Sequence, residues 1–270
     1  MGDGLISRRH ALGIGVAAAA LTGCSTAQHA AAHRSTTAPA TAAPPATTAT
    51  SPGRTPTPAR KAGHRTKPMS TGPAAQVVRG SGRRPQVALT FHGAGDLGIV
   101  RQVMAILAQH KAKVTVLAVG TWLAATPDAA RMVLDHGHEL GNHTWSHPDL
   151  SAFPAEPMLV QIERCRDRLD ALTGSPGAFF RQSQGQYPTA LELTEAGKAG
   201  YRRVLSYDVD SLDWSDPGPV AIRSACTAAR AGSVVSMHLG HPGTVLALPA
   251  VLQDLADRGL APVTASELLR

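Results

Sequence analysis

Histidines are the residues of this chain most able to do chemistry, and two of them stand four positions apart. His143 and His147 lie within Gly-Asn-His-Thr-Trp-Ser-His-Pro, residues 141–148. On one turn of helix this spacing places both imidazoles on the same face, where they can bind one metal ion. Histidine pairs with this spacing also occur by chance in cores and on surfaces, so the pair alone is weak evidence for a site.

Two other histidines directly follow apolar runs. His92 follows the run 87–91, and His238 follows the run 234–237. In folds that alternate strands and helices, functional side chains lie where strands end and loops begin. These histidines are therefore further candidates for a site.

The elements that would position these residues alternate between short apolar strands and helices. The expected strands are 87–91, 114–119, 179–180, 203–207, 234–237 and 262–263, and the expected helices are 100–109, 129–136 and 158–173. Such alternation predicts a parallel sheet covered by helices. For a domain over residues 84–270, it predicts an α/β fold of the compact or incomplete (β/α) barrel type.

The first 24 residues have the features of an export signal. Arg8 and Arg9 precede the apolar run 11–21, which is too short to span a bilayer, since a spanning helix needs roughly 20 apolar residues. The paired arginines resemble a twin-arginine signal, and the Leu-Thr-Gly-Cys that ends at Cys24 resembles the bacterial lipoprotein box. We expect a signal peptide over 1–24 and an extracytoplasmic protein that is anchored to the membrane through lipidated Cys24. The alternative is an ordinary signal peptide with a chance cysteine.

A tether is expected over residues 25–83, which are rich in Ala, Thr, Pro and Ser and poor in large apolar side chains. Such a composition cannot offset the entropy of ordering, so we predict a disordered linker. Residues 1–84 hold 11 of the 26 Lys and Arg residues but only one of the 19 acidic residues, so the net charge of +7 belongs to this part. The mildly acidic remainder argues against a nucleic-acid partner, while the basic tail suits anionic surfaces. We expect a monomer.

The two cysteines after Cys24 are Cys165 and Cys226. Outside the cell they could form a disulfide. The equally acceptable alternative is a pair of buried thiols, because spacing in the sequence does not show whether their Cα atoms lie close enough.

Five segments, in order along the chain, resemble the motifs of one family, the polysaccharide deacetylases (carbohydrate esterase family 4, with the NodB-homology fold). Residues 137–148 closely resemble the family's second motif. The resemblance covers roughly residues 85–269 and implies a distorted (β/α) barrel of the NodB-homology type. The segments that resemble the first, third, fourth and fifth motifs are Thr90-Phe91, 180–185, 208–214 and 234–238.

The resemblance implies metal-dependent removal of acetyl groups from glycans such as peptidoglycan or chitin oligomers. The metal, expected to be Zn²⁺, polarises the acetyl carbonyl and activates water, while a carboxylate base and a histidine acid transfer protons. The implied metal ligands are His143 and His147. The other implied roles are the acid for His238, its carboxylate partner for Asp213, the cation that holds the base for Arg181, and the wall of the acetyl pocket for Trp214.

The first motif departs from the family. His92 and Gly93 stand where the family has two adjacent aspartates, one the base and the other the third metal ligand. Asp96 is the nearest carboxylate, and we expect it to reach the metal as third ligand or to act as base. His92 is a candidate base or ligand, and as a ligand it would be neutral, because a cation would repel Arg181. Structural alternatives stay open: His92 as a buried histidine bonded to backbone, and Asp96 as a group that satisfies loop amides.

Three functions are compatible with this departure, and the least favoured of them is a hydrolase that acts on some other amide or ester. The favoured interpretation is an active metal-dependent deacetylase, because the residues of the acid side are all present. The alternative is a catalytically impaired deacetylase-fold protein that binds glycan in the cell wall, because activity depends on the base. His136 and His138 are expected to face solvent, and His241 is interpreted as a loop histidine, with an auxiliary ligand as the alternative.

Overall fold

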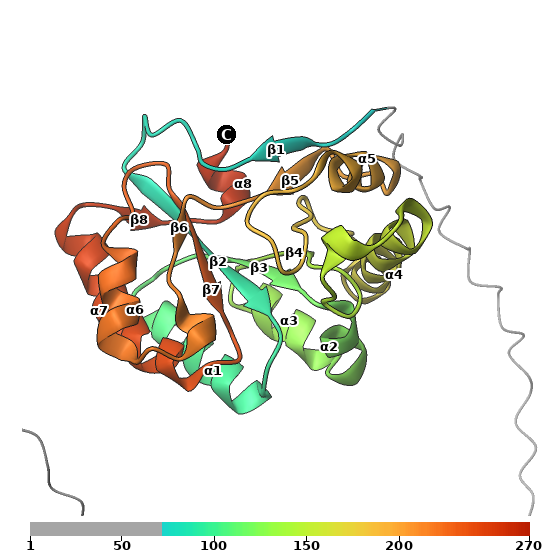
Figure 1. Ribbon diagram of the computed structural model, residues 1–270. Helices are drawn as coiled ribbons and strands as arrows, with labels where there is room; N and C mark the ends of the chain where they lie inside the picture. Colours follow the sequence, from blue (N-terminus) through green and yellow to red (C-terminus); the bar gives the residue numbers. More distant parts are fainter. Residues whose placement is uncertain (1–71) are drawn as a thin grey trace, which may run out of the picture. The chain divides into compact units, whose positions relative to one another are not determined.

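The computed structural model of the protein describes residues 72–270 (Figure 1). Its strands are β1 (Ala75–Val77), β2 (Gln86–Gly93), β3 (Thr115–Ala118), β4 (Glu139–Asn142), β5 (Arg203–Leu205), β6 (Val209–Asp210), β7 (Val234–His238) and β8 (Ala261–Pro262). Its α-helices are α1 (Leu97–Gln109), α2 (Gly120–Ala125), α3 (Asp128–Asp135), α4 (Ala155–Thr173), α5 (Ala190–Lys198), α6 (Pro219–Cys226), α7 (Pro242–Asp257) and α8 (Ala265–Leu268). Two short 3₁₀ helices are η1 (Leu150–Ala152) and η2 (Asp213–Ser215).

The strands pair in parallel throughout. The main sheet has the order β4-β3-β2-β7-β6, with β8 paired to one end of β2. Single parallel bridges through Phe180 connect Asn142 of β4 with Val204 of β5, and β5 pairs with β1. The strands therefore follow one another around a distorted, incompletely closed barrel, and the predicted α/β fold with a parallel sheet is confirmed.

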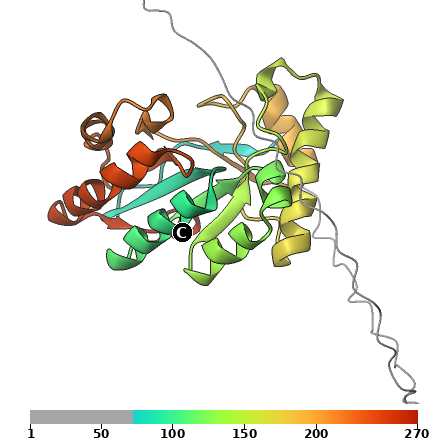
Figure 2. The same ribbon diagram turned by 90° about the horizontal axis from the view of Figure 1, so that it is seen from below.

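The central strand β2 explains why the core forms here. Residues 87–91 are entirely buried, because β2 has neighbours on both edges and helices over it. A strand in this position is a nearly continuous apolar run rather than an alternating one. Helices α6 and α7 lie on the side of β6, and α4 and α5 on the side of β4 and β5, as both views show (Figures 1 and 2).

The helix ends follow local sequence signals. Thr189 and Glu192 form a reciprocal capping box at the start of α5. Gly174, with φ of 73°, ends α4 in the left-handed conformation that glycine adopts without steric cost. Asp96 caps the start of α1 by accepting hydrogen bonds from the amides of Gly98 and Ile99.

The folded part begins before the boundary that the composition predicts. β1 pairs in parallel with β5, and the buried Ala74 packs in the cluster formed with α4 and α5. The expectation that the linker runs to residue 83 is therefore wrong for residues 72–83. A three-residue edge strand, held mainly by backbone hydrogen bonds, leaves almost no trace in composition.

The two cysteines are free, buried thiols in different helices, Cys165 in α4 and Cys226 in α6. Of the two alternatives, the structure therefore has the buried thiols. No helix between residues 72 and 270 is long and apolar enough to cross a membrane. The predicted signal peptide, Cys24 anchor and most of the linker lie outside the described residues.

Candidate metal and acid–base site

Strand register brings the candidate histidines to one edge of the sheet. His92 and His238 are direct partners in the parallel pairing of β2 and β7. His143 follows β4 immediately, and its amide donates to Ala118 at the end of β3. Because parallel strands end at the same edge, side chains that are far apart in sequence meet there.

The histidine pair lies on a tight loop and not on the helical turn that the spacing predicts. Thr144 and His147 both have positive φ, 67° and 57°. The side chain of Asn142 accepts from the Thr144 amide, and the Thr144 hydroxyl accepts from the His147 amide. These two hydrogen bonds hold the loop and turn both imidazoles inward, so the convergence was predicted correctly but its backbone cause was not.

Three imidazoles gather at this loop. His92, His143 and His147 each offer one ring nitrogen within 4.8 Å of the others. The Nε2 atoms of His143 and His147 are 3.1 Å apart, and the ring centroids of His92 and His143 are 4.2 Å apart. Two nitrogen ligands of a tetrahedral ion, each at about 2.0–2.1 Å, stand about 3.3 Å apart, so this spacing suits a metal ion.

The protonation states suit the same purpose. Burial lowers the pKa of His92 and of His143 well below the ordinary value, and the neighbouring imidazoles lower both further. Burial also lowers the pKa of His147, with His238 adding to the effect. Neutral imidazoles keep a free lone pair, which a metal ion requires.

Hydrogen bonds define which nitrogen stays free in two of the rings. Nδ1 of His143 lies 3.0 Å from the carbonyl oxygen of Arg181 and must donate to it, which leaves Nε2 as the acceptor atom. Nε2 of His92 lies 3.3 Å from the Ser236 hydroxyl, while its Nδ1 is buried without a partner among the described residues. An unpaired buried nitrogen is costly unless a ligand satisfies it. The three residues therefore can hold a metal ion.

Asp96 does not join this group, which corrects the expectation that it is the third ligand or the base. Its Oδ1 accepts from the Gly98 amide at 2.7 Å and from the Ile99 amide at 3.3 Å. A carboxylate is favourable at a helix N-terminus because unpaired amides and the helix dipole meet there. The alternative, that Asp96 satisfies loop amides, is the arrangement that the structure has, and His92 is the third member of the group that could hold an ion.

Gly93 is required by the close approach of strand β3. A Cβ at this position would stand 2.7 Å from Cγ1 of Val116 and 2.9 Å from Cα of Ala118. The second of these is a backbone atom, which cannot move aside cheaply. A carboxylate at position 93 is therefore excluded without a shift of the sheet.

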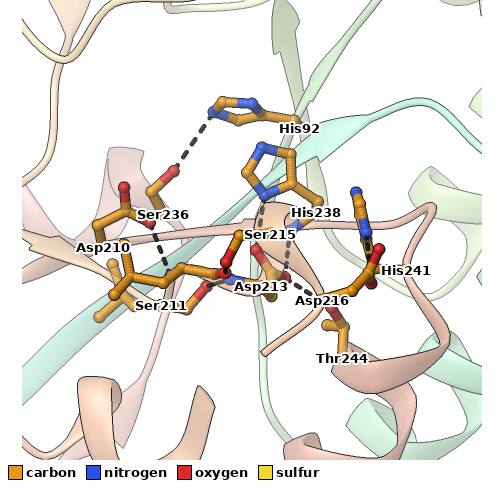
Figure 3. Close-up of polar contacts among 12 residues, drawn as sticks. His92, Asp210, Ser211, Asp213, Ser215, Asp216, Ser236, His238, His241 and Thr244 are labelled. Carbon is orange, nitrogen blue, oxygen red and sulfur yellow. Dashed lines mark hydrogen bonds and ion pairs between the residues drawn. The ribbon is translucent and has the colours of Figure 1, made fainter. Parts of the chain in front are cut away.

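His238 forms a buried pair with Asp213, as the sequence predicts (Figure 3). Nδ1 of His238 lies 2.7 Å from Oδ1 of Asp213, and the His238 amide donates to Oδ2 at 2.8 Å. Thr244, at the start of α7, donates its hydroxyl proton to the same Oδ2 at 2.6 Å. Burial works against the ionised form of Asp213, but the hydrogen bonds from His238 and Thr244 outweigh it, and the pKa of Asp213 is lowered.

Arg181 is fully buried, and within residues 72–270 the structure shows no carboxylate base beside it of the kind that the resemblance implies. Its guanidinium donates to the Thr90 hydroxyl at 2.9 Å and to the carbonyl oxygens of Leu205 and Ser206. Among the described residues no carboxylate accepts from it, and Nη1 has no partner there. Burial lowers the pKa of Arg181 to about 10. Within this part of the chain, Arg181, the cation that would hold the base, therefore lies in the site without a carboxylate base to hold.

A pocket of about 380 Å³ opens over these groups and has His92, His147, His238 and His241 in its lining. Trp214 is not among the lining residues and is 54% exposed in η2, so the structure does not place it as the predicted wall. Sequence reasoning missed Asn142 and Thr244, which orient the site. His241 lies in the loop before α7, as interpreted, and also lines the pocket. For Asn142 the signal was its place directly before the histidine pair.

The comparisons with known proteins agree with this architecture. The family described as polysaccharide deacetylase matches residues 79–204. A peptidoglycan-N-acetylglucosamine deacetylase of Bacillus cereus is 34% identical over 68% of this chain and 88% of its own length. A chitooligosaccharide deacetylase of Bradyrhizobium is 35% identical over 60% of this chain and 74% of its own length. The uncharacterized protein YlxY of Bacillus subtilis is 25% identical over 72% of this chain, which spans 60% of that relative.

Two solved structures share the fold. A family 4 carbohydrate esterase from Streptomyces lividans, in complex with acetate, is 30% identical with a TM-score of 0.60, over 65% of this chain and 90% of that one. A CE4-family pseudoenzyme from Bacillus anthracis is 24% identical with a TM-score of 0.68, over 73% of this chain and 69% of that one.

Proposed function

Because the chain belongs to the polysaccharide deacetylase family, we propose that it removes acetyl groups from an envelope or extracellular polysaccharide of the peptidoglycan or chitin type, with a metal ion held by three histidines. The observation that carries this proposal is the convergence of His92, His143 and His147 beside the His238–Asp213 pair in one pocket. The amide-hydrolysing relatives support the reaction class, and the expected export signal supports a location outside the cytoplasm.

The expected ion is Zn²⁺, since three neutral imidazoles are typical ligands for it. When bound, it would polarise the acetyl carbonyl and make water a stronger nucleophile. His92 takes the place that the family gives to a carboxylate, and thereby completes a set of three protein ligands.

His238 is then the residue that has to exchange protons with the reacting groups. Asp213 accepts only, so Nδ1 of His238 donates to it and Nε2 is the atom that exchanges protons. The described residues place no carboxylate in the three-histidine group. His238 Nε2 therefore takes up the proton that water releases as its oxygen attacks the acetyl carbon, in place of the absent carboxylate base.

Metal analysis together with acetate release tests this function. The purified chain should carry about one metal ion and release acetate from acetylated peptidoglycan or chitin oligomers. His147→Ala should lose both the metal and the activity, because two ligands hold the ion poorly. His110→Gln, at an exposed histidine after α1, is the matched control and should keep both. A wild-type chain that stays metal-free and inactive when zinc is supplied would overturn the proposal.

A second candidate is a glycan-binding module without hydrolysis. The observation that favours it is the missing base: within the described part of the chain, Arg181 is buried with an unpaired Nη1 and no carboxylate partner. The fold does not decide between the two, because it also occurs in a pseudoenzyme. Measured affinity for a glycan, with no acetate released in the presence of metal, would establish the second candidate.

A further inference from the structure

A second histidine–carboxylate pair stands next to the first one. Nδ1 of His241 lies 2.9 Å from Oδ1 of Asp216. Both members come three residues after their counterparts, His241 after His238 and Asp216 after Asp213, so two adjacent loops carry the same pair twice (Figure 3).

The two pairs differ in their exposure. In the first pair the side chains of His238 and Asp213 are 17% and 0% exposed, and in the second those of His241 and Asp216 are 27% and 64% exposed. The ring centroids of His238 and His241 are 5.6 Å apart, and both rings line the pocket. His241 is thus the more solvent-accessible of two acid–base groups that face one cavity.

The backbone around His241 is fixed in place. His241 is the residue before α7, and Pro242 forms the first position of that helix. The preceding Gly240 packs against Gly95 so closely that a Cβ on Gly95 would stand 2.5 Å from Cα of Gly240. Asp216 is held in the left-handed conformation, with φ of 50°, at the end of η2. A histidine set between such elements has a defined ring position, unlike a histidine on a long free loop.

The proposed function leaves a task for such a group. Hydrolysis of an amide needs one proton taken from water and one given to the leaving nitrogen. Since His238 lies against His92, with ring centroids 4.1 Å apart, it is the group placed to serve the attacking water. Once it has taken that proton, the nitrogen needs another donor.

We propose that His241, oriented by Asp216, is a second catalytic acid–base residue that protonates the leaving nitrogen. Asp216 accepts the hydrogen on Nδ1, so Nε2 carries the proton that is transferred. The oxygen of water forms a bond to the acetyl carbon, and its proton goes to Nε2 of His238. The carbon–nitrogen bond then breaks, its electron pair stays on nitrogen, and the proton of His241 binds there. Acetic acid and the free amine leave, the acid gives up its remaining proton to solvent as acetate forms, and the proton on His238 returns to His241 through solvent. This inference rests on the proposed function.

Substrates with different leaving groups test the assignment. An N-acetylated chitin oligomer needs a proton on its leaving nitrogen, whereas 4-nitrophenyl acetate releases a stable phenolate that needs none. His241→Gln should lower kcat for the oligomer about 100-fold and change the rate for the ester less than threefold. His238→Gln should lower both rates. Asp216→Asn should act in the same direction as His241→Gln but more weakly, and imidazole in solution should partly restore the rate of His241→Ala on the oligomer.

Two further measurements separate the possible outcomes. The ¹⁵N signals of the His241 ring in the metal-free protein should show hydrogen on Nδ1, and Asp216→Ala should remove that preference. Metal content should be unchanged in His241→Gln and in the control His110→Gln. If His241→Gln raises only KM, or lowers amide and ester rates equally, His241 is not the acid and the inference fails while the proposed function stands. If the wild type releases no acetate from any substrate, both fail.

Discussion

The two sides of the pocket differ in how completely their polar groups are satisfied. On the β7 side, Asp213 accepts from the His238 amide, the His238 ring and the Thr244 hydroxyl. On the β2 side are His92, at the end of this strand, and Arg181, whose guanidinium donates to Thr90 of β2. Nδ1 of His92 and Nη1 of Arg181 are both buried without partners among the described residues. The first side is complete as the chain folds, whereas the second has the unsatisfied groups that a ligand would complete.

The largest expected effect is on the complete side. Asp213→Asn should lower kcat for deacetylation by about 10³- to 10⁴-fold, because an amide favours the wrong tautomer of His238. Steady-state acetate release measures this, with Asp149→Asn at an exposed position as control. Metal content should be unchanged. A fall of less than tenfold would mean that the pair is structural and that proton transfer occurs elsewhere.

An intermediate effect is expected on the incomplete side, from two variants that each place an aspartate at one of two adjacent positions, 92 or 93. His92→Asp should raise the free energy of unfolding of the metal-free protein by about 1–3 kcal/mol, because it gives Arg181 an anionic partner. Arg181 is near enough to contribute to the lowered pKa of His92. Gly93→Asp should lower the same free energy by about 1–3 kcal/mol or more, because its Cβ meets the backbone of β3.

Urea unfolding of both variants in the presence of a chelator measures whether the two changes in the free energy of unfolding have opposite signs. Equal destabilisation by the two aspartates would show that Arg181 gains nothing from an anionic partner. The unpaired groups on the β2 side would then not be a source of instability. His92→Asp should also weaken zinc binding, since it removes one of the three imidazoles.

The smallest effect concerns a buried histidine outside the site. His138, which was expected to face solvent, is 6% exposed, accepts from the Val114 amide through Nδ1 and has no partner for Nε2 within residues 72–270. Burial lowers its pKa to about 4, with Lys113 and His136 adding to the effect. The unfolded chain binds a proton near pH 6.5 and the folded chain only near pH 4, so the stability contributed by His138 is lost as pH falls from about 6.5 to about 4.

Unfolding measured across this pH window should show a smaller loss of stability for His138→Gln than for the wild type. An identical pH dependence would mean that His138 protonates without cost. The residue also sharpens the comparison: the His136 ring stacks beside it at 6.2 Å between centroids, but among the described residues the two are not part of a group of three possible ligands. An unsatisfied atom therefore becomes a candidate ligand only within a converging group.

Much of the fold was predictable from local signals. The buried run at β2, the helical spacing of α1, α3 and α4 and the βα alternation all gave elements close to those observed. The expected strand 262–263 lies within one residue of β8. β1 and the two-residue strand β6 were not predicted, because their stability comes from pairing with distant strands rather than from their own side chains.

For the site, the sequence by itself indicated most of the residues that could carry the chemistry. It identified the histidine pair, the Asp213 and His238 partners and the departure at positions 92 and 93, since these depend on residue type and order. Tertiary structure decided the rest. It placed His92 rather than Asp96 beside the histidine pair, because helix α1 uses the aspartate as its cap. It also set His241 with Asp216 beside the first pair, because two loops far apart in the chain end at the same edge of a parallel sheet.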